Sequence, residues 1–113
     1  MANHEPLTPP VFHILVALSD GERHGYGIMQ DVARQTNDAL QLGPGTLYGC
    51  LKRMLAAGLV EEAEEHPDGS ERRRYYRITP SGKQAVRTET ERMAAAVASA
   101  RSVLSPSKAG GNA

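Results

Sequence analysis

Residues 42–60 read LGPGTLYGCLKRMLAAGLV. Pro44 suits the first turn of a helix, where its missing N–H costs nothing, and Gly58 suits the residue just past a helix end. Between them the apolar residues recur at helical spacing and form one face: Leu47, Leu51, Met54 and Leu55. The stretch therefore predicts a helix over residues 44–57 with one buried side.

The opposite side of this helix is bare and cationic. At about 100° per residue it holds two cations, one hydroxyl and otherwise small residues: Gly45, Thr46, Gly49, Lys52, Arg53 and Ala56. A face with so little side chain lets the backbone approach a grooved surface, and the cations favour the groove of a nucleic acid. The other interpretation is a small amphipathic core helix with a poor surface, and the stretch alone leaves both open.

Composition limits the classes of function. The chain has 113 residues, which predicts one domain whose modest core is often supplemented by oligomerisation. With 13 basic and 13 acidic residues the net charge is zero, so nucleic-acid binding must rest on a local basic patch. A single cysteine, Cys50, excludes an intrachain disulfide, and we expect it to be a buried, inert thiol. No apolar run approaches the ~20 residues of a membrane span, and no signal pattern opens the chain, so we expect a cytoplasmic protein.

A first helix is predicted from residue 9 to about residue 19, after a disordered N-terminus over residues 1–7. Thr8 is a plausible N-cap, with Pro9 at the first helical position. Its apolar residues form two stripes, and a helix that is apolar on two sides is covered on two sides. The second stripe, Phe12 and Val16, is therefore expected to meet another subunit.

A second helix is predicted over residues 26–36, followed by a short connection into the helix at residues 44–57. Two helices joined by a short turn, the second with a bare cationic face, are typical of the helix-turn-helix motif. The N-terminus of the second helix, near Gly25 and Tyr26, offers backbone N–H groups to a phosphate.

Two strands are predicted over residues 59–65 and 72–79, joined by a turn that contains Pro67, Asp68 and Gly69. In the second strand Tyr76 and Ile78 share the face that is the better candidate for the core. The first strand is acidic, and the second carries consecutive arginines: Arg72, Arg73 and Arg74. These arginines support the hairpin by pairing with glutamates across the strands, or they form a basic wing for DNA phosphates or a minor groove. We favour the wing.

A long last helix is predicted over residues 80–104, with a disordered tail over residues 105–113. Two seven-residue ladders interleave into a heptad seam: Val86, Thr90, Met93, Val97, Ala100 and Leu104. The helix could lie on its own domain, but it is longer than a three-helix domain needs. We interpret it as a dimerisation helix.

The residues that could support catalysis or metal binding are not arranged for it. The histidines, His4, His13, His24 and His66, lack a zinc-like spacing to one another or to Cys50. No nucleophile elbow, oxyanion-hole motif or phosphate-binding glycine loop is present. We therefore expect no enzyme activity, no cofactor and no metal.

With these elements in order, the sequence resembles the PadR family of bacterial transcriptional regulators. The resemblance rests on HGYGI at 24–28, GTLY at 45–48, LKRM at 51–54, AGLV at 57–60 and RRYYRITPSG at 73–82, in this order and spacing. It implies a winged helix-turn-helix followed by a dimerisation helix, here of the short subfamily with one such helix. The family consists mostly of repressors that bind palindromic operators as dimers, and many release DNA when a small aromatic molecule binds near the dimer interface.

Carried over to this chain, the resemblance makes residues 44–57 the recognition helix and Arg72, Arg73 and Arg74 the basic wing. Tyr48 matches the family's tyrosine at the protein–DNA boundary. The chain departs from the family pattern at Gly49, which replaces a frequent proline. It also lacks tryptophan, so the stacking of a drug on that side chain does not transfer. The acidic first strand lies outside the motif.

Together these observations predict a mainly α (α+β) fold: a winged helix-turn-helix over residues 8–79 with a two-stranded wing, and a dimerisation helix over residues 80–104. The expected function is sequence-specific, ligand-responsive repression by a homodimer bound to double-stranded DNA. The expected DNA-binding residues are Gly25, Tyr26, Gly45, Thr46, Tyr48, Gly49, Lys52, Arg53, Arg72, Arg73 and Arg74. A small aromatic effector is expected between the first and last helices, at Phe12, Val16, Met93 and Val97. Zero net charge favours one rival, a protein-interaction or ligand-sensing module that does not bind DNA tightly.

Overall fold

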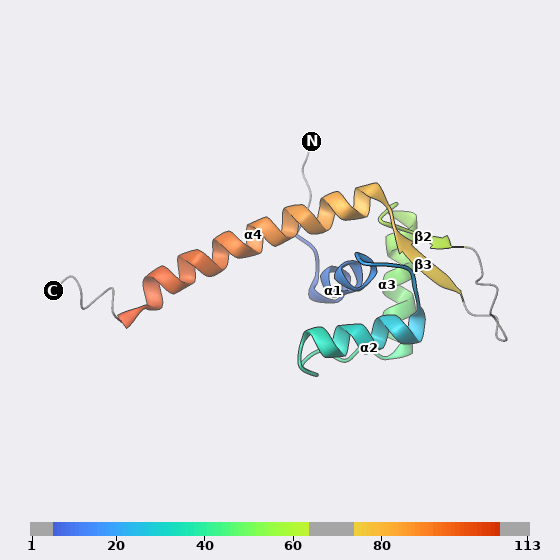
Figure 1. Cartoon of the computed structure of the whole chain (residues 1–113), viewed down its shortest axis with the longest axis horizontal. Helices are drawn as coiled ribbons and strands as arrows, with labels where there is room; N and C mark the ends of the chain where they lie inside the picture. Colours follow the sequence, from blue (N-terminus) through green and yellow to red (C-terminus); the bar gives the residue numbers. More distant parts are fainter. Residues whose placement is uncertain (1–5, 64–73, 107–113) are drawn as a thin grey trace.

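The computed structural model of the chain describes residues 6–63 and 74–106. Its elements are α1 (Pro9–Leu18), β1 (Arg23–His24), α2 (Gly25–Gln35), α3 (Pro44–Ala56), β2 (Val60–Ala63), β3 (Tyr75–Ile78) and α4 (Pro80–Leu104). The three shorter helices and the sheet form a compact body, and α4 extends far beyond it (Figure 1). The predicted helices are confirmed with their ends within one or two residues. Predictions for residues 1–5, 64–73 and 107–113 lie outside the described residues.

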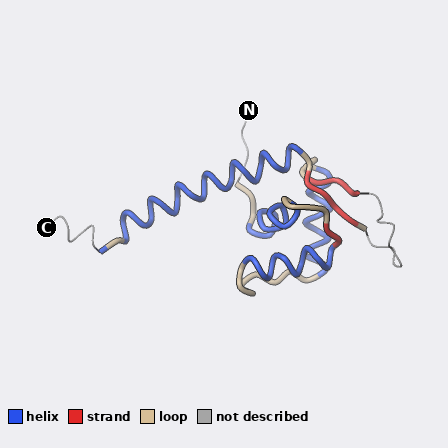
Figure 2. Tube along the Cα trace, in the orientation of Figure 1, coloured by secondary structure: helices blue, strands red, loops and turns tan. Residues whose placement is uncertain are grey.

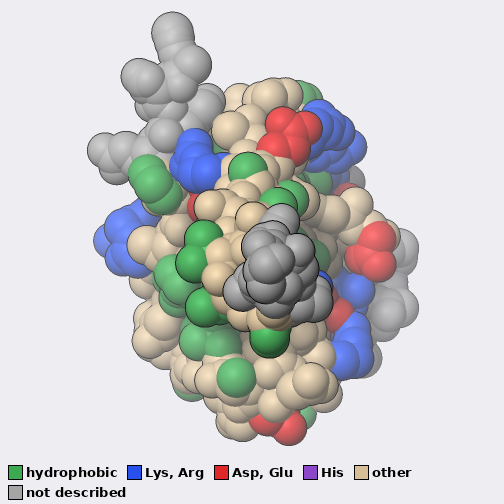
Figure 3. All heavy atoms as spheres, turned by 90° about the vertical axis from the view of Figure 1, so that its left-hand side faces the viewer, with side chains coloured by type: hydrophobic (Ala, Val, Ile, Leu, Met, Phe, Trp, Pro, Cys, Tyr) green, Lys and Arg blue, Asp and Glu red, His purple; other side chains and the backbone are tan. Residues whose placement is uncertain are grey.

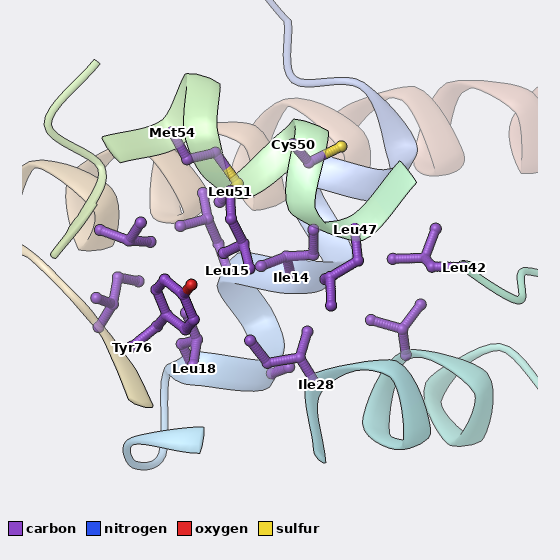
Figure 4. Close-up of a cluster of buried hydrophobic side chains, with 14 residues drawn as sticks. Ile14, Leu15, Leu18, Ile28, Leu42, Leu47, Cys50, Leu51, Met54 and Tyr76 are labelled. Carbon is purple, nitrogen blue, oxygen red and sulfur yellow. The ribbon is translucent and has the colours of Figure 1, made fainter. Parts of the chain in front are cut away.

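Helix α1 lies in the middle of the body and supplies the centre of the core. Thr8 caps it as predicted, because its side chain accepts a hydrogen bond from the Val11 N–H at 3.4 Å. Ile14, Leu15 and Leu18 are buried against side chains from α2, α3 and the sheet (Figure 4). Leu7, predicted to belong to the disordered N-terminus, packs against this core.

Helix α3 packs its apolar side on α1 and ends as its sequence predicts. Gly58 adopts a φ of 78°, a conformation that glycine reaches without strain. The N–H groups of Leu59 and Gly58 donate to the carbonyls of Met54 and Leu55 at 2.9 and 3.1 Å, which closes the helix end. The chain therefore turns sharply from α3 into β2.

The sheet has three strands in the order β1-β3-β2, so it contains one strand more than the predicted two-stranded wing. Arg23 and His24, for which the sequence predicts no strand, pair with Tyr76 and Tyr75 on β3. A strand of two residues has no periodicity that a sequence pattern could reveal, and only its partner defines it. The other prediction for the sheet is confirmed, because Tyr76 and Ile78 are the buried residues of β3.

Helix α4 is anchored where β3 ends. Thr79 caps α4 by accepting from the Gly82 N–H, and its hydroxyl donates to the Gly58 carbonyl at 2.6 Å. Gly82 is buried here, against Leu59 and Ile78. Beyond this anchor residues 91–104 are all exposed, and the helix runs away from the body (Figure 2). In the view from the C-terminal end of α4, hydrophobic side chains are exposed mainly in the central part of the face (Figure 3).

The close approach at Gly82 yields a prediction for stability. A Cβ at this position would overlap the Leu59 carbonyl oxygen and press on Ile78. Gly82→Ala should therefore lower the free energy of unfolding by about 1–3 kcal/mol, the usual cost of overpacking. Gly45→Ala is the matched control, because nothing lies within 4 Å of its new methyl group, and it should be neutral or slightly stabilising. Urea denaturation of both variants measures the difference, and equal stabilities would contradict the packing described here.

Candidate nucleic-acid interface

The two sides of α3 differ sharply in burial. Leu47, Cys50, Leu51 and Met54 are buried in the core, as predicted for the apolar side and for the thiol. The opposite side is open, with Gly45, Thr46, Lys52 and Arg53 exposed and Gly49 half-buried. The structure thus brings these predicted residues together on one open surface of the helix, where most of the side chains are small.

The surface carries two cations, Lys52 and Arg53. Within the described ranges 6–63 and 74–106, neither Lys52 nor Arg53 forms an ion pair. Arg53 leans over the preceding turn of α3, where one of its Nη atoms lies 3.6 Å from the Cys50 sulfur. The small Gly49 leaves room for this guanidinium on the helix surface.

The beginning of α2 lies beside this surface. Gly25 is buried beneath the Tyr48 side chain, and a Cβ there would overlap the Tyr48 hydroxyl. Tyr26 is 60% exposed and Tyr48 is 47% exposed, so two phenols stand at the border between α2 and α3. This contact places the N-terminal N–H groups of α2 next to the bare side of α3.

His24 holds the first turn of α2 and was not predicted to do so. Its Nδ1 accepts a hydrogen bond from the Gly27 N–H at 3.1 Å, and its ring meets that of Tyr75 edge to face at 5.3 Å. The residue directly before α2 is not Ser, Thr, Asp or Asn, and a histidine is easily overlooked as a cap. The only signal for it in the sequence is the HGYG segment, in which glycines at 25 and 27 follow the histidine closely.

A second unpredicted cluster joins α2 to its neighbours. Asp31 is 8% exposed and pairs with Arg34, while its carboxylate also accepts from Gln35 at 3.0 Å. Arg23 of β1 lies 3.9 Å from the same carboxylate, and Gln35 reaches the His13 carbonyl on α1 at 3.0 Å. A buried carboxylate with these partners fixes how α2 sits on α1 and β1.

Only some of the arginines of the predicted basic strand lie within the described residues. Arg72 and Arg73 lie outside the described residues. Arg74 pairs with Glu62 at 3.4 Å. Arg77 pairs with Glu61 at 2.7 Å and with Glu22 at 3.0 Å, and these hydrogen bonds raise the pKa of its guanidinium. Cross-strand pairing, one of the two roles considered for the basic strand, is therefore present at both described arginines.

The predicted seam of α4 begins in the body and ends in solvent. Val86 is partly buried against the core, and the Thr90 hydroxyl donates to its carbonyl at 2.7 Å. Further along, Met93 and Ala100 are exposed, Val97 is 49% exposed and Leu104 is 75% exposed. Of the residues predicted to bind an effector, Phe12 and Val16 lie half-buried on α1.

A cavity of about 540 Å³ lies between the N-terminal segment, α1 and α4. Its wall includes Leu7, Val11, Glu89 and Arg92, so it adjoins the predicted effector residues without being lined by them.

Among the described residues no group of three metal-ligating side chains comes together, and no helix is long and apolar enough to cross a membrane.

Comparison with known proteins decides the family. Residues 14–88 match the transcriptional regulator PadR-like family. The chain belongs to this family. The transcriptional regulator Rv3488 of Mycobacterium tuberculosis is 40% identical over 80 residues, which cover 71% of this PadR-like chain and 70% of that protein. An uncharacterized protein in transposon TN4556 of Streptomyces fradiae is 40% identical over 81 residues, but the match spans only 22% of its length and 72% of this chain.

Solved structures show the same fold. A PadR family transcription regulator from Clostridium difficile superposes with a TM-score of 0.74 at 23% identity, over 86% of this PadR-like chain and 99% of that one. Bacillus subtilis PadR in complex with operator DNA superposes with a TM-score of 0.60 at 23% identity, over 69% of this chain and 44% of that one. The winged-helix fold with a long C-terminal helix, as predicted, is thereby confirmed.

The cap on α2 yields a prediction for this PadR-like regulator. His24→Ala should lower the free energy of unfolding by about 0.5–2 kcal/mol, because the Gly27 N–H is left without its acceptor. His24→Asn should retain most of the stability, since asparagine is a good N-cap although it removes the ring that meets Tyr75. Thermal or urea unfolding distinguishes the two variants. If both are destabilised equally, the histidine acts through its ring and not as a cap.

Proposed function

We propose that this PadR-like regulator binds double-stranded DNA sequence-specifically, with α3 in the major groove. The observation that carries the proposal is the exposed side of α3, which combines small residues with two cations that form no ion pair among the described residues, while its other side is sealed in the core. A helix of this kind fits the width of the major groove and brings donors to base edges. The likeness of the fold to Bacillus subtilis PadR, which was crystallised with operator DNA, supports this use of the surface.

The candidate residues divide into two roles. Lys52 and Arg53 project from the bare side of α3 and read base edges, with Thr46 beside them, while Gly45 and Gly49 permit close approach. Tyr48, Tyr26 and the N-terminus of α2 at Gly25 contact the phosphates that border the groove. Arg74 contacts a phosphate, together with Arg72 and Arg73.

The functional unit that we propose is a homodimer held by α4. The exposed part of the heptad seam, from Met93 to Leu104, is apolar or small and has no cover within the described chain. A second copy of α4 would bury it as coiled-coil helices do. Two-fold symmetry then places two α3 helices in successive major grooves about 34 Å apart, so the site is a near-palindrome.

Regulation completes the proposal. A dimer that occupies an operator blocks transcription, which makes repression the simplest outcome. We place a small aromatic effector between α1 and α4, at Phe12, Val16, Met93 and Val97. The neighbouring cavity of about 540 Å³ supports this location, because it shows that α1 and α4 leave space for a small molecule.

The two roles predict different effects of substitution. With an operator selected from a random duplex pool, Arg53→Ala should narrow the affinity gap between operator and scrambled DNA, by about 1–3 kcal/mol if the interaction with the base is bidentate. Arg74→Ala should weaken binding to both duplexes in parallel. It should also lower the salt slope by roughly 1 for each phosphate that the variant no longer neutralises, or about 2 in a dimer. Titrations at several salt concentrations measure both quantities.

If both variants change the two duplexes in parallel, the division of roles is wrong. If the wild-type protein shows no salt-dependent binding to any duplex, the proposal yields to the rival function, a protein-interaction or ligand-sensing module.

The dimer is tested by shortening α4. A chain that ends after Gly82 should aggregate or unfold, because it lacks the seam and also the α4 residues that cover α1, such as Ala85 and Val86. A chain that ends after Glu91 keeps that cover and should fold as a monomer. Sedimentation equilibrium measures both masses. A stable dimer of the second variant would contradict the assignment of the seam.

A further inference from the structure

One face of the sheet continues from the core into solvent. Side chains alternate along a strand, so Val60 and Glu62 on β2 share a face with Ile78 and Tyr76 on β3, to which they are directly paired. The same alternation places Arg74 on this face. Val60, Ile78 and Tyr76 are buried against the core, whereas Glu62 and Arg74 emerge from it into solvent.

Arg74 is held in place by this face. Its Nη1 lies 3.4 Å from a carboxylate oxygen of Glu62, and the guanidinium is also close enough to the phenol of Tyr76 to influence its pKa. Burial raises the pKa of this phenol, with the charge of Glu62 and the nearby Tyr48 acting in the same direction, while Arg74 opposes them. The guanidinium therefore lies beside Glu62 at the exposed end of this face, and Tyr48 of the proposed interface acts on the same phenol as Arg74 does.

We propose that Glu62 is a resident anion that competes with DNA phosphate for Arg74. This inference rests on the proposed DNA binding and specifies how its strength is set. In free protein the carboxylate occupies the donors that a phosphate oxygen would take. On binding DNA, Arg74 exchanges Glu62 for a phosphate, and the released carboxylate faces the negatively charged duplex. Glu62 thereby lowers affinity for DNA of any sequence.

The exchange is feasible because the pair is exposed. The side chains of Arg74 and Glu62 are 71% and 47% exposed, so water screens the attraction and either partner can be replaced. A DNA phosphodiester carries the same single negative charge as a carboxylate, but its neighbours along the backbone add to the attraction, and the release of condensed counterions favours the contact further. The ion pair therefore weakens the contact between Arg74 and phosphate without preventing it.

The neighbouring residue Glu61 provides a matched control. It precedes Glu62 on β2, so its side chain lies on the opposite face, where it pairs with Arg77. Arg77 also pairs with Glu22, so removing Glu61 does not free this guanidinium. Glu61→Gln and Glu62→Gln change the net charge equally, and only the second removes the partner of Arg74.

The experiment compares these variants on a non-specific duplex and on an operator selected from a random pool. Glu62→Gln should bind both duplexes about two- to fivefold more tightly per subunit than Glu61→Gln, the range expected for an exposed ion pair. The ratio of operator to non-specific affinity should stay the same. In the Arg74→Ala background the two variants should become equal, and unfolding curves should confirm that all of them fold.

Two results would overturn the inference while leaving the proposed function intact. One is equal affinity of Glu61→Gln and Glu62→Gln for DNA, which would mean that Glu62 affects binding only through the net charge of the protein. The other is an undiminished advantage of Glu62→Gln in the Arg74→Ala background, which would place its effect elsewhere. Absence of salt-dependent binding by the wild-type protein would instead remove the proposed function itself, and this inference with it.

Discussion

The packing of α3 against α1 determines which surface the molecule can offer to DNA. Leu47 and Leu51 of α3 are sealed against Ile14 and Leu15 of α1, and each such side chain contributes about 1.5–3 kcal/mol when fully buried. Rolling α3 about its axis would expose them and bury Lys52, so the roll of the helix is fixed. The bare cationic side therefore faces outward for reasons of packing and not because of DNA.

The same constraint reaches α4 through a short chain of contacts. The carbonyl of Gly58, where α3 ends, accepts a hydrogen bond from the Thr79 hydroxyl, and Leu59 lies against Gly82 at the start of α4. The direction in which α4 leaves the body is thus tied to the end of α3, the proposed recognition helix. In a dimer joined by α4, this tie would set the distance between the two recognition helices, and a ligand that moved α4 would change it.

Charge is distributed so that a neutral protein presents a positive surface. The described cations of the hairpin, Arg74 and Arg77, are paired with glutamates, whereas Lys52 and Arg53 on α3 are not paired within the described residues. The positive field is therefore concentrated where the proposed base contacts are made. This arrangement reconciles a net charge of zero with the proposed nucleic-acid recognition, in which the acidic strand β2 would limit non-specific attraction.

Features coded by local sequence could be predicted, and features that need a distant partner could not. The limits of α3 follow from Pro44 and Gly58, whose effects on the backbone are local. Strand β1 escaped prediction because Arg23 and His24 become a strand only through β3. Opposite charges on the two hairpin strands suggested cross-strand pairing. The specific pairing of Arg74 with Glu62 depends on a register that the sequence does not state.

The most direct test of the proposed DNA-reading surface follows the backbone amide resonances of isotopically labelled protein as a duplex is added. We expect the largest shifts on the open side of α3, at residues 46, 49, 52 and 53, with further shifts at the start of α2. The exposed end of α4 should change little, because we assign it to the partner subunit. Shifts that centre on α4 or α1 and leave α3 unchanged would contradict the central claim that α3 reads DNA.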